Sequence, residues 1–185
     1  MAPWSTEIMD CFQSVKPDLE PDFTPAGYNK LLNSLFPINT PYTVFPRTHW
    51  LDISSAHISG TIFIIYFKNS PVFLLDLYAY RTLPRVSTRE SADTHIRTQI
   101  RDMLPYCPLE TLHAVCTFGT RLCFYTASAG VAISPALAPP SADVDLTHDR
   151  APVDLWDCDL LDDDGAIRLK EVINKIRNQC ENLDS

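Results

Sequence analysis

The sequence predicts a single α+β domain with a mixed central sheet and a C-terminal helix. The length of 185 residues suits one domain. Hydrophobic residues make up 45% of the chain and aromatic residues 10%, which is enough to build a sizeable core. The segments follow one another as helix, three strands, helix, two strands, helix, and this order is typical of such a domain. We place the domain at residues 25–181 and expect residues 1–24 to form an irregular N-terminal arm with a short helix.

Residues 25–36 have the pattern of the first helix of this domain. Pro25 suits a first helical turn, and Pro37 ends the pattern. The apolar stripe of this helix contains Tyr28, Leu31, Leu32, Leu35 and Phe36. Residues 42–45 then have the pattern of a strand, whereas residues 49–58 are ambiguous and fit a continuation of that strand with a turn.

Two adjacent strands follow. Residues 58–67 and 72–80 are rich in β-branched and aromatic side chains, and the turn between them favours antiparallel pairing. Alternate residues of a strand share a face, so Asp76 lies on the same face as Tyr78 and Tyr80. The sequence therefore sets a carboxylate in the interior of an otherwise apolar strand.

Residues 87–106 have the pattern of a long amphipathic helix. Ser87 and Glu90 match a capping box, in which the hydroxyl binds a backbone amide and the carboxylate reaches back. The predicted buried stripe contains Ala92, Ile96, Ile100, Met103 and Leu104. A charged row on the neighbouring face contains Arg89, Asp93, Arg97 and Arg101.

The last third of the chain completes the domain. Residues 112–125 predict two strands around a turn, and residues 134–152 predict an irregular surface crossing. Residues 166–180 predict the final helix. We expect the aspartates at 162–164 to bind the free amides at its N-terminus and to complement its dipole. The alternative, a calcium loop starting at Leu160, lacks a carboxylate at its first position.

The composition excludes several kinds of partner and cofactor. The five glycines are too dispersed to form a phosphate-cradling loop. A net charge of −8 provides no overall positive field for nucleic acid, so we expect a small molecule or a protein as partner. The six cysteines include no C-x-x-C pair, and a zinc knuckle is therefore not predicted.

The sequence also predicts no association with a membrane. Residues 58–67, the longest uncharged apolar stretch, cover about half of a membrane span. The first residues lack the basic start and apolar run of a signal peptide. We expect a soluble, reduced protein of the cytoplasm or nucleus.

Several sequence blocks resemble a large family of uncharacterised proteins from mushroom-forming fungi. These blocks are residues 28–32, 35–37, 70–76, 87–93, 118–125 and 154–159. The resemblance covers roughly residues 25–180, and many members carry Glu-Ile-Lys where this chain has Asp76-Leu77-Tyr78. The element order, with an acidic residue inside the third strand, also resembles the PD-(D/E)XK nuclease-like superfamily. That resemblance implies an αβββαβ restriction-endonuclease-like core.

The resemblance also implies a chemistry, which this chain does not retain in full. Active members hold Mg²⁺ with an upstream aspartate and the acidic residue of the third strand, and a lysine two residues later assists the attacking water. Asp76 fills the acidic position. Tyr78 cannot replace the lysine, because its phenol is neutral near pH 7. Residues 58–61 contain no upstream carboxylate, so we expect a degenerate motif and no bound metal.

The candidate site is centred on Asp76. One interpretation is structural, with this carboxylate paired to Arg89, to Arg97 or to a tyrosine hydroxyl. The other interpretation is a remodelled pocket that contains both catalytic residues and binding residues. The candidate catalytic residues are Asp76, Tyr78 and His95, and the candidate binding residues are Lys68, Tyr80, Arg89 and Arg97. His49 and His57 flank a loop near the same strands and could approach the same cleft, but with Asp52 they match no known spacing of metal ligands.

Three functions remain open from the sequence. The first is a binding or regulatory module that uses the former active-site cleft, and the second is an enzyme that acts on a small organic substrate by acid–base chemistry. The third is a residual nuclease, which alone would need Mg²⁺; otherwise no cofactor is expected. A closed apolar pocket beside Asp76 would favour the enzyme, and a wide open surface would favour the binding module.

Overall fold

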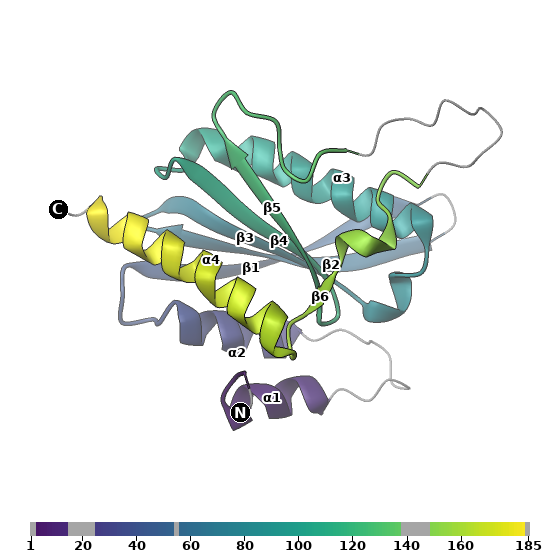
Figure 1. Cartoon of the computed structure of the whole chain (residues 1–185), viewed down its shortest axis with the longest axis horizontal. Helices are drawn as coiled ribbons and strands as arrows, with labels where there is room; N and C mark the ends of the chain where they lie inside the picture. Colours follow the sequence, from purple (N-terminus) through teal and green to yellow (C-terminus); the bar gives the residue numbers. More distant parts are fainter. Residues whose placement is uncertain (1–2, 15–24, 54–55, 138–148, 184–185) are drawn as a thin grey trace.

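A computed structural model describes residues 3–14, 25–53, 56–137 and 149–183. The described chain forms one six-stranded sheet with the strand order β1-β2-β3-β4-β5-β6 (Figure 1). The strands are β1 (Tyr42–Ile53), β2 (Ala56–Phe67), β3 (Ser70–Tyr78), β4 (Thr111–Phe118), β5 (Arg121–Ser128) and β6 (Cys158–Asp159). Strands β3 and β4 are parallel, and every other neighbouring pair is antiparallel. The predicted α+β class with a mixed sheet is confirmed.

In the described part of the chain, four α-helices accompany the sheet. They are α1 (Thr6–Gln13), α2 (Pro25–Leu35), α3 (Val86–Met103) and α4 (Asp163–Asn182). Helix α3 connects the parallel strands β3 and β4, a connection that a tight turn cannot make. The chain thus runs in the order α2, β1, β2, β3, α3, β4, and it ends in a helix.

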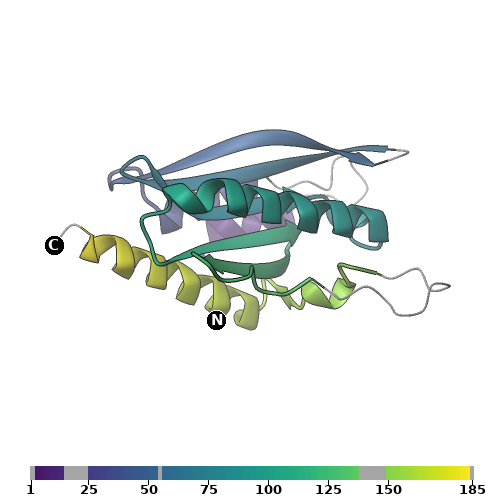
Figure 2. The same cartoon turned by 90° about the horizontal axis from the view of Figure 1, so that it is seen from above.

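The two faces of the sheet carry separate hydrophobic clusters. Helices α1, α2 and α4 supply side chains to one cluster, and α3 supplies side chains to the other. Figures 1 and 2 show α4 and α3 on opposite faces of the twisted sheet. Because both faces are covered, every residue of β3 after Ser70 is buried. Asp76 therefore lies in the most enclosed part of the sheet.

Strand β1 is longer than the sequence pattern suggests. It continues through Pro46 to Ile53, which confirms that the segment after His49 continues the strand; residues 54–55, which precede β2, lie outside the described residues. A proline is tolerated there because β1 is an edge strand that pairs with β2 alone. The antiparallel register places His49 directly opposite Gly60. In this register the His49 ring extends over Gly60 toward Tyr78 of β3.

The ends of two helices differ from the predictions. Helix α3 begins at Val86 with Arg85 as its N-cap and no side-chain cap, so the Ser87 capping box is wrong. The Glu90 carboxylate instead accepts a hydrogen bond from the backbone N–H of Arg150 at 3.0 Å. Helix α4 begins at Asp163, and its N-cap Asp162 makes no side-chain hydrogen bond, so the predicted amide capping there is also wrong. The aspartates of the first turn still complement the helix dipole.

Helix α1 packs into the same core as the rest of the chain. The Trp4 indole N–H, just before this helix, donates to the carbonyl oxygen of Leu160 at 2.8 Å. The Phe12 ring meets the Tyr28 ring edge to face, with centroids 5.1 Å apart. The remainder of the predicted arm, residues 15–24, lies outside the described residues. Within the described part of the chain, no helix combines the length and apolarity required to cross a membrane.

Candidate functional site

The centre of the candidate site is the fully buried carboxylate of Asp76. Its neighbours in the sheet are Ile62 on β2 and Cys116 on β4, and both are buried. An unpaired charge in such surroundings is strongly unfavourable, so polar partners must come from elsewhere. They come from three secondary-structure elements.

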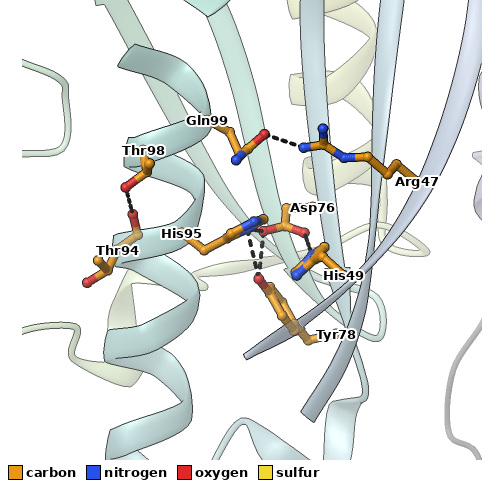
Figure 3. Close-up of polar contacts among 8 residues, drawn as sticks. All are labelled: Arg47, His49, Asp76, Tyr78, Thr94, His95, Thr98 and Gln99. Carbon is orange, nitrogen blue, oxygen red and sulfur yellow. Dashed lines mark hydrogen bonds and ion pairs between the residues drawn. The ribbon is translucent and has the colours of Figure 1, made fainter. Parts of the chain in front are cut away.

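Two histidines and a tyrosine surround this carboxylate (Figure 3). His49 Nε2 lies 2.8 Å from Asp76 Oδ1, and His95 Nδ1 lies 2.7 Å from Oδ2. The Tyr78 hydroxyl donates to the same Oδ2 at 2.7 Å and lies 3.3 Å from His95 Nδ1. The two imidazole rings are stacked, with centroids 3.9 Å apart and an interplanar angle of 20°. We call these four residues the Asp76 cluster.

A glycine allows His49 to reach the carboxylate. A Cβ atom added at Gly60 would lie 2.6 Å from His49 Nε2 and 2.8 Å from Tyr78 Cε1. Both distances are shorter than real Cβ contacts, so any larger residue would have to displace one of the rings. Gly60 thus provides the space in which the His49 and Tyr78 rings meet. A glycine within a strand often marks such a close approach.

Helix α3 delivers the second histidine. Its residues Ala92, Ile96 and Ile100 are buried against the sheet, and His95 stands beside this stripe. One turn later, Gln99 accepts a hydrogen bond from Arg47 of β1 at 2.6 Å (Figure 3). Helix α3 and strand β1 are therefore linked twice, once through the Asp76 cluster and once through this exposed pair.

The electrostatic environment keeps the Asp76 carboxyl ionised. Burial alone would raise its pKa, but the hydrogen bonds from His49 and His95, together with their charge, outweigh burial and lower the pKa. Burial, and then the negative charge of Asp76, raise the pKa of Tyr78 well above its usual value. The cluster therefore combines a carboxylate with a neutral phenol that acts as a hydrogen-bond donor.

The two histidines give the buried carboxylate a route to the surface. The His49 side chain is 12% exposed and that of His95 is 19% exposed, whereas Asp76 is inaccessible. His95 lines a depression of about 410 Å³ that is open to solvent. Its other walls include Trp50, Glu90 and Arg150, which mix aromatic, acidic and basic groups. The surface beside the cluster is therefore open and mixed in polarity.

The structure brings together the three predicted catalytic residues, and it adds His49. From the sequence, His49 is expected near the same strands and able to approach the same cleft, but its alignment with Asp76 depends on the β1–β2 register. Two signals pointed to it: Arg47, His49 and Leu51 share one strand face, and Gly60 interrupts a strand. His57 lies further along β2 and is exposed.

The predicted binding residues lie apart from the cluster. Lys68 is in the β2–β3 turn, roughly 20 Å along β2 from Ile62, the residue that pairs with Asp76 in the sheet. Its ammonium group lies 5.6 Å from the centre of the Phe67 ring. Tyr80 follows the end of β3 and is 56% exposed.

The interpretation that Asp76 pairs with a tyrosine hydroxyl is confirmed, and the tyrosine is Tyr78.

The two predicted arginines bind other parts of the chain. Arg89 donates to the carbonyl oxygens of Ala151 and Leu83 and forms an ion pair with Asp149. These contacts hold residues 149–151 against helix α3. The suggested pairing of Arg89 with Asp76 is therefore wrong, since its guanidinium group is occupied at this other position.

Arg97 belongs to a second buried network. It donates to the Asp93 carboxylate at 2.8 Å and to the carbonyl oxygen of Pro135 at 2.7 Å. The Tyr125 hydroxyl donates to the other oxygen of Asp93. Pairing of Arg97 with Asp76 is thus also wrong. The charged row of α3 serves mainly to anchor the chain that follows β5.

The cluster offers three donor atoms to a metal ion. One atom each from His49, Asp76 and His95 lie within 4.8 Å of one another. Two imidazole nitrogens and one carboxylate oxygen do not fit Mg²⁺, which prefers oxygen ligands. They fit the softer divalent transition metals, for which imidazole is a common ligand.

Comparison of the chain with models of protein families, with curated proteins and with solved structures found no match.

Proposed function

We propose that this protein is a catalytically degenerate member of the PD-(D/E)XK nuclease-like fold that binds a ligand through the remodelled cleft around Asp76. The order α2, β1, β2, β3, α3, β4 and the parallel pairing of β3 with β4 support the fold assignment. The central acidic residue of the third strand supports the position of the cleft.

The observation that carries the proposal is the set of partners of Asp76. In an active nuclease of this fold, the third-strand carboxylate would share a metal with an upstream carboxylate and lie beside a lysine. Here its partners are the imidazoles of His49 and His95 and the hydroxyl of Tyr78. Gly60 lies in the stretch where the upstream carboxylate is expected, and Tyr78 stands at the lysine position. This donor set does not support Mg²⁺-dependent hydrolysis of a phosphodiester.

The surface beside the cluster suits binding. The exposed part of the His95 imidazole lines a depression that is open to solvent and carries both acidic and basic groups. A net charge of −8 disfavours nucleic acid as the ligand, so a small molecule or a protein segment is the better candidate.

A cleavage assay tests the loss of nuclease function. Purified protein is incubated with single- and double-stranded DNA and with RNA, in the presence of Mg²⁺ or Mn²⁺. We expect no cleavage above the level of the Asp76→Ala variant. Metal-dependent cleavage that disappears in that variant would overturn the proposal.

The Tyr78→Lys variant makes the assay sharper. It restores the ammonium at the position that active members reserve for lysine, but the upstream carboxylate is still missing at residues 58–61. We therefore expect Tyr78→Lys to be inactive as well. Robust cleavage by this variant would show that another carboxylate completes the metal site.

One observation favours an acid–base enzyme as a second candidate. The Nδ1 atom of His95 is bound to Asp76, which leaves the other ring nitrogen, Nε2, outside this hydrogen bond. A histidine oriented by a carboxylate in this way is a common general base. If the protein is an enzyme, hydrolysis of activated esters should be lost in His95→Gln and retained in His57→Gln. Equal rates in the two variants would exclude this role for His95.

A further inference from the structure

We infer that His49, Asp76 and His95 form a binding site for one divalent transition-metal ion of the zinc class. This inference rests on the proposed binding function and names the ligand that the Asp76 cluster would hold. It differs from the Mg²⁺ chemistry of the nuclease fold in its donor atoms, two of which are imidazole nitrogens.

The spacing of the donor atoms is close to that of a metal centre. Zinc binds histidine nitrogen and carboxylate oxygen at about 2.0–2.2 Å, so neighbouring donors in a tetrahedral site are about 3.4 Å apart. The two histidine nitrogens now lie 2.7 and 2.8 Å from carboxylate oxygens of Asp76. All three donor atoms lie within 4.8 Å of one another. Shifts of about 1 Å, within the range of side-chain rotations, would convert the hydrogen-bonded arrangement into a coordinating one.

The Tyr78 hydroxyl supplies an outer contact of the kind that metal sites use. It donates to Asp76 Oδ2 at 2.7 Å and is fully buried. Hydrogen bonds to a ligating carboxylate fix its orientation and strengthen metal binding. The three ligands also stand on rigid elements, since β1 and β3 belong to one sheet and α3 packs on it. The site is therefore largely formed before any metal arrives.

In the metal-free protein the hydrogen bond to the ionised Asp76 carboxylate requires a proton on His49 Nε2, and a metal bound at Nε2 would move the ring hydrogen to Nδ1. The Nδ1 atom of His49 is buried without a hydrogen-bond partner among the described residues. Many metal-bound histidines donate their second N–H to an acceptor. Here a metal at Nε2 would leave the Nδ1 hydrogen unpaired, so we expect weaker binding than in a structural zinc site.

The position of the cluster leaves room for a further ligand on the metal. Three protein ligands are typical of zinc sites that keep an open coordination position. His95 lines the open depression, whose walls also include Glu90 and Arg150. An oxygen or nitrogen donor of a small molecule in this depression would complete the coordination. This arrangement connects metal binding to the binding function proposed above.

The test is a metal titration of the full chain under reducing conditions. Zn²⁺ binding is measured by calorimetry, and Co²⁺ binding by visible absorption, which distinguishes nitrogen and oxygen ligands from sulfur. We expect one ion per chain and a Co²⁺ spectrum without the charge-transfer band of a cysteine thiolate. The chain has six free cysteines, so the Co²⁺ spectrum is needed to exclude binding by sulfur.

The variants His49→Gln, His95→Gln and Asp76→Asn should each reduce the affinity at least about tenfold. His57→Gln, an exposed histidine on the same sheet, serves as the matched control and should bind like the wild type. Circular dichroism establishes that each variant is folded, and the two glutamine variants keep the test decisive if Asp76→Asn fails to fold. Absence of binding to the wild type, equal affinity in all variants or a thiolate band would overturn the inference.

The outcome is distinguishable from failure of the proposed function. If no metal binds and no nucleic acid is cleaved, this inference fails and the degenerate-nuclease proposal stands. If Asp76-dependent cleavage is observed with Mg²⁺, the proposed function fails whatever the result with Zn²⁺.

Discussion

His49 lies directly opposite Gly60, and the histidine ring occupies the space that a side chain at position 60 would need. Replacement of a strand glycine by alanine often stabilises a protein, because alanine restricts the unfolded chain. At this position the added methyl group would lie 2.6 Å from His49 Nε2, so the sign should reverse. We predict that Gly60→Ala lowers the free energy of unfolding by about 1–3 kcal/mol, measured by urea denaturation.

The neighbouring variant Ser59→Ala is the control, since residue 59 points to the other face of β2. It should change stability by less than about 0.5 kcal/mol. The histidine NMR signals should shift in Gly60→Ala and stay unchanged in Ser59→Ala. Equal stability of the two variants would show that His49 can move aside without loss.

Tyr78→Phe should separate the hydroxyl from the ring. The variant keeps the packing of the aromatic ring but removes the donor to Asp76 Oδ2. We predict a loss of about 1–2 kcal/mol in unfolding free energy and a fall of about tenfold or more in Zn²⁺ affinity. Tyr80→Phe is the control, because Tyr80 is exposed and lies outside the cluster. An unchanged Zn²⁺ affinity in Tyr78→Phe would mean that the hydroxyl does not orient the carboxylate.

His113 on β4 predicts an acid-sensitive stability. Burial, with a smaller contribution from the charge of Lys175, lowers the pKa of His113 to about 4. In the unfolded chain this histidine binds a proton at an ordinary pKa of about 6.5. Between about pH 6.5 and about pH 4 the unfolded state therefore binds more protons than the folded state, and a falling pH favours unfolding. This histidine therefore contributes a loss of stability across that range and none above it. After an allowance for solvent screening, the loss is about 1–2 kcal/mol.

The variant His113→Leu tests this prediction. The unfolding free energies of the variant are measured at several pH values. Below about pH 6.5, the pKa of histidine in the unfolded chain, they should fall less steeply with falling pH than those of the wild type. The Nε2 atom of His113 is buried without a hydrogen-bond partner among the described residues, so an apolar replacement should be tolerated. An identical pH dependence in the variant would assign the acid sensitivity to other groups.

Arg89→Ala should destabilise the fold without affecting metal binding. The arginine holds two backbone carbonyls and the Asp149 carboxylate, and its removal leaves these acceptors without their donor. We predict a loss of about 2–4 kcal/mol in unfolding free energy. Arg101→Ala, an exposed arginine of the same helix row, should lose less than about 0.5 kcal/mol. The Zn²⁺ affinity of Arg89→Ala is measured about 10 °C below the melting midpoint of the variant, where the variant is folded. A lower affinity than that of the wild type under these conditions would contradict the separation of the two networks.

Much of the fold follows from local patterns in the sequence. Helices α2 and α3 and the β2–β3 hairpin have strong periodicity, and their positions were predicted to within a few residues. Strand β1 was predicted only in part, because Pro46 and the polar residues after it break the pattern of a strand. An edge strand tolerates both features, and its edge position is a tertiary property.

The candidate site was predicted to a similar extent. Asp76 and Tyr78 were found together because strand alternation alone places them on one face. His49 depends on the register between two strands, and the role of Arg89 depends on residues 149–151, which are distant in sequence. Helix capping at Ser87 was predicted wrongly because the N-cap is Arg85, two residues earlier, and Glu90 has a different partner.

The Asp76 cluster is assembled from segments that are distant along the chain: His49 and His95 lie 27 and 19 positions from Asp76. Neither contact exists until the hairpin has closed and the crossover helix has docked, and such long-range contacts form slowly during folding. Binding of a ligand at the cluster would thus require the complete native topology. A ligand that binds only the folded protein would shift the folding equilibrium toward the native state.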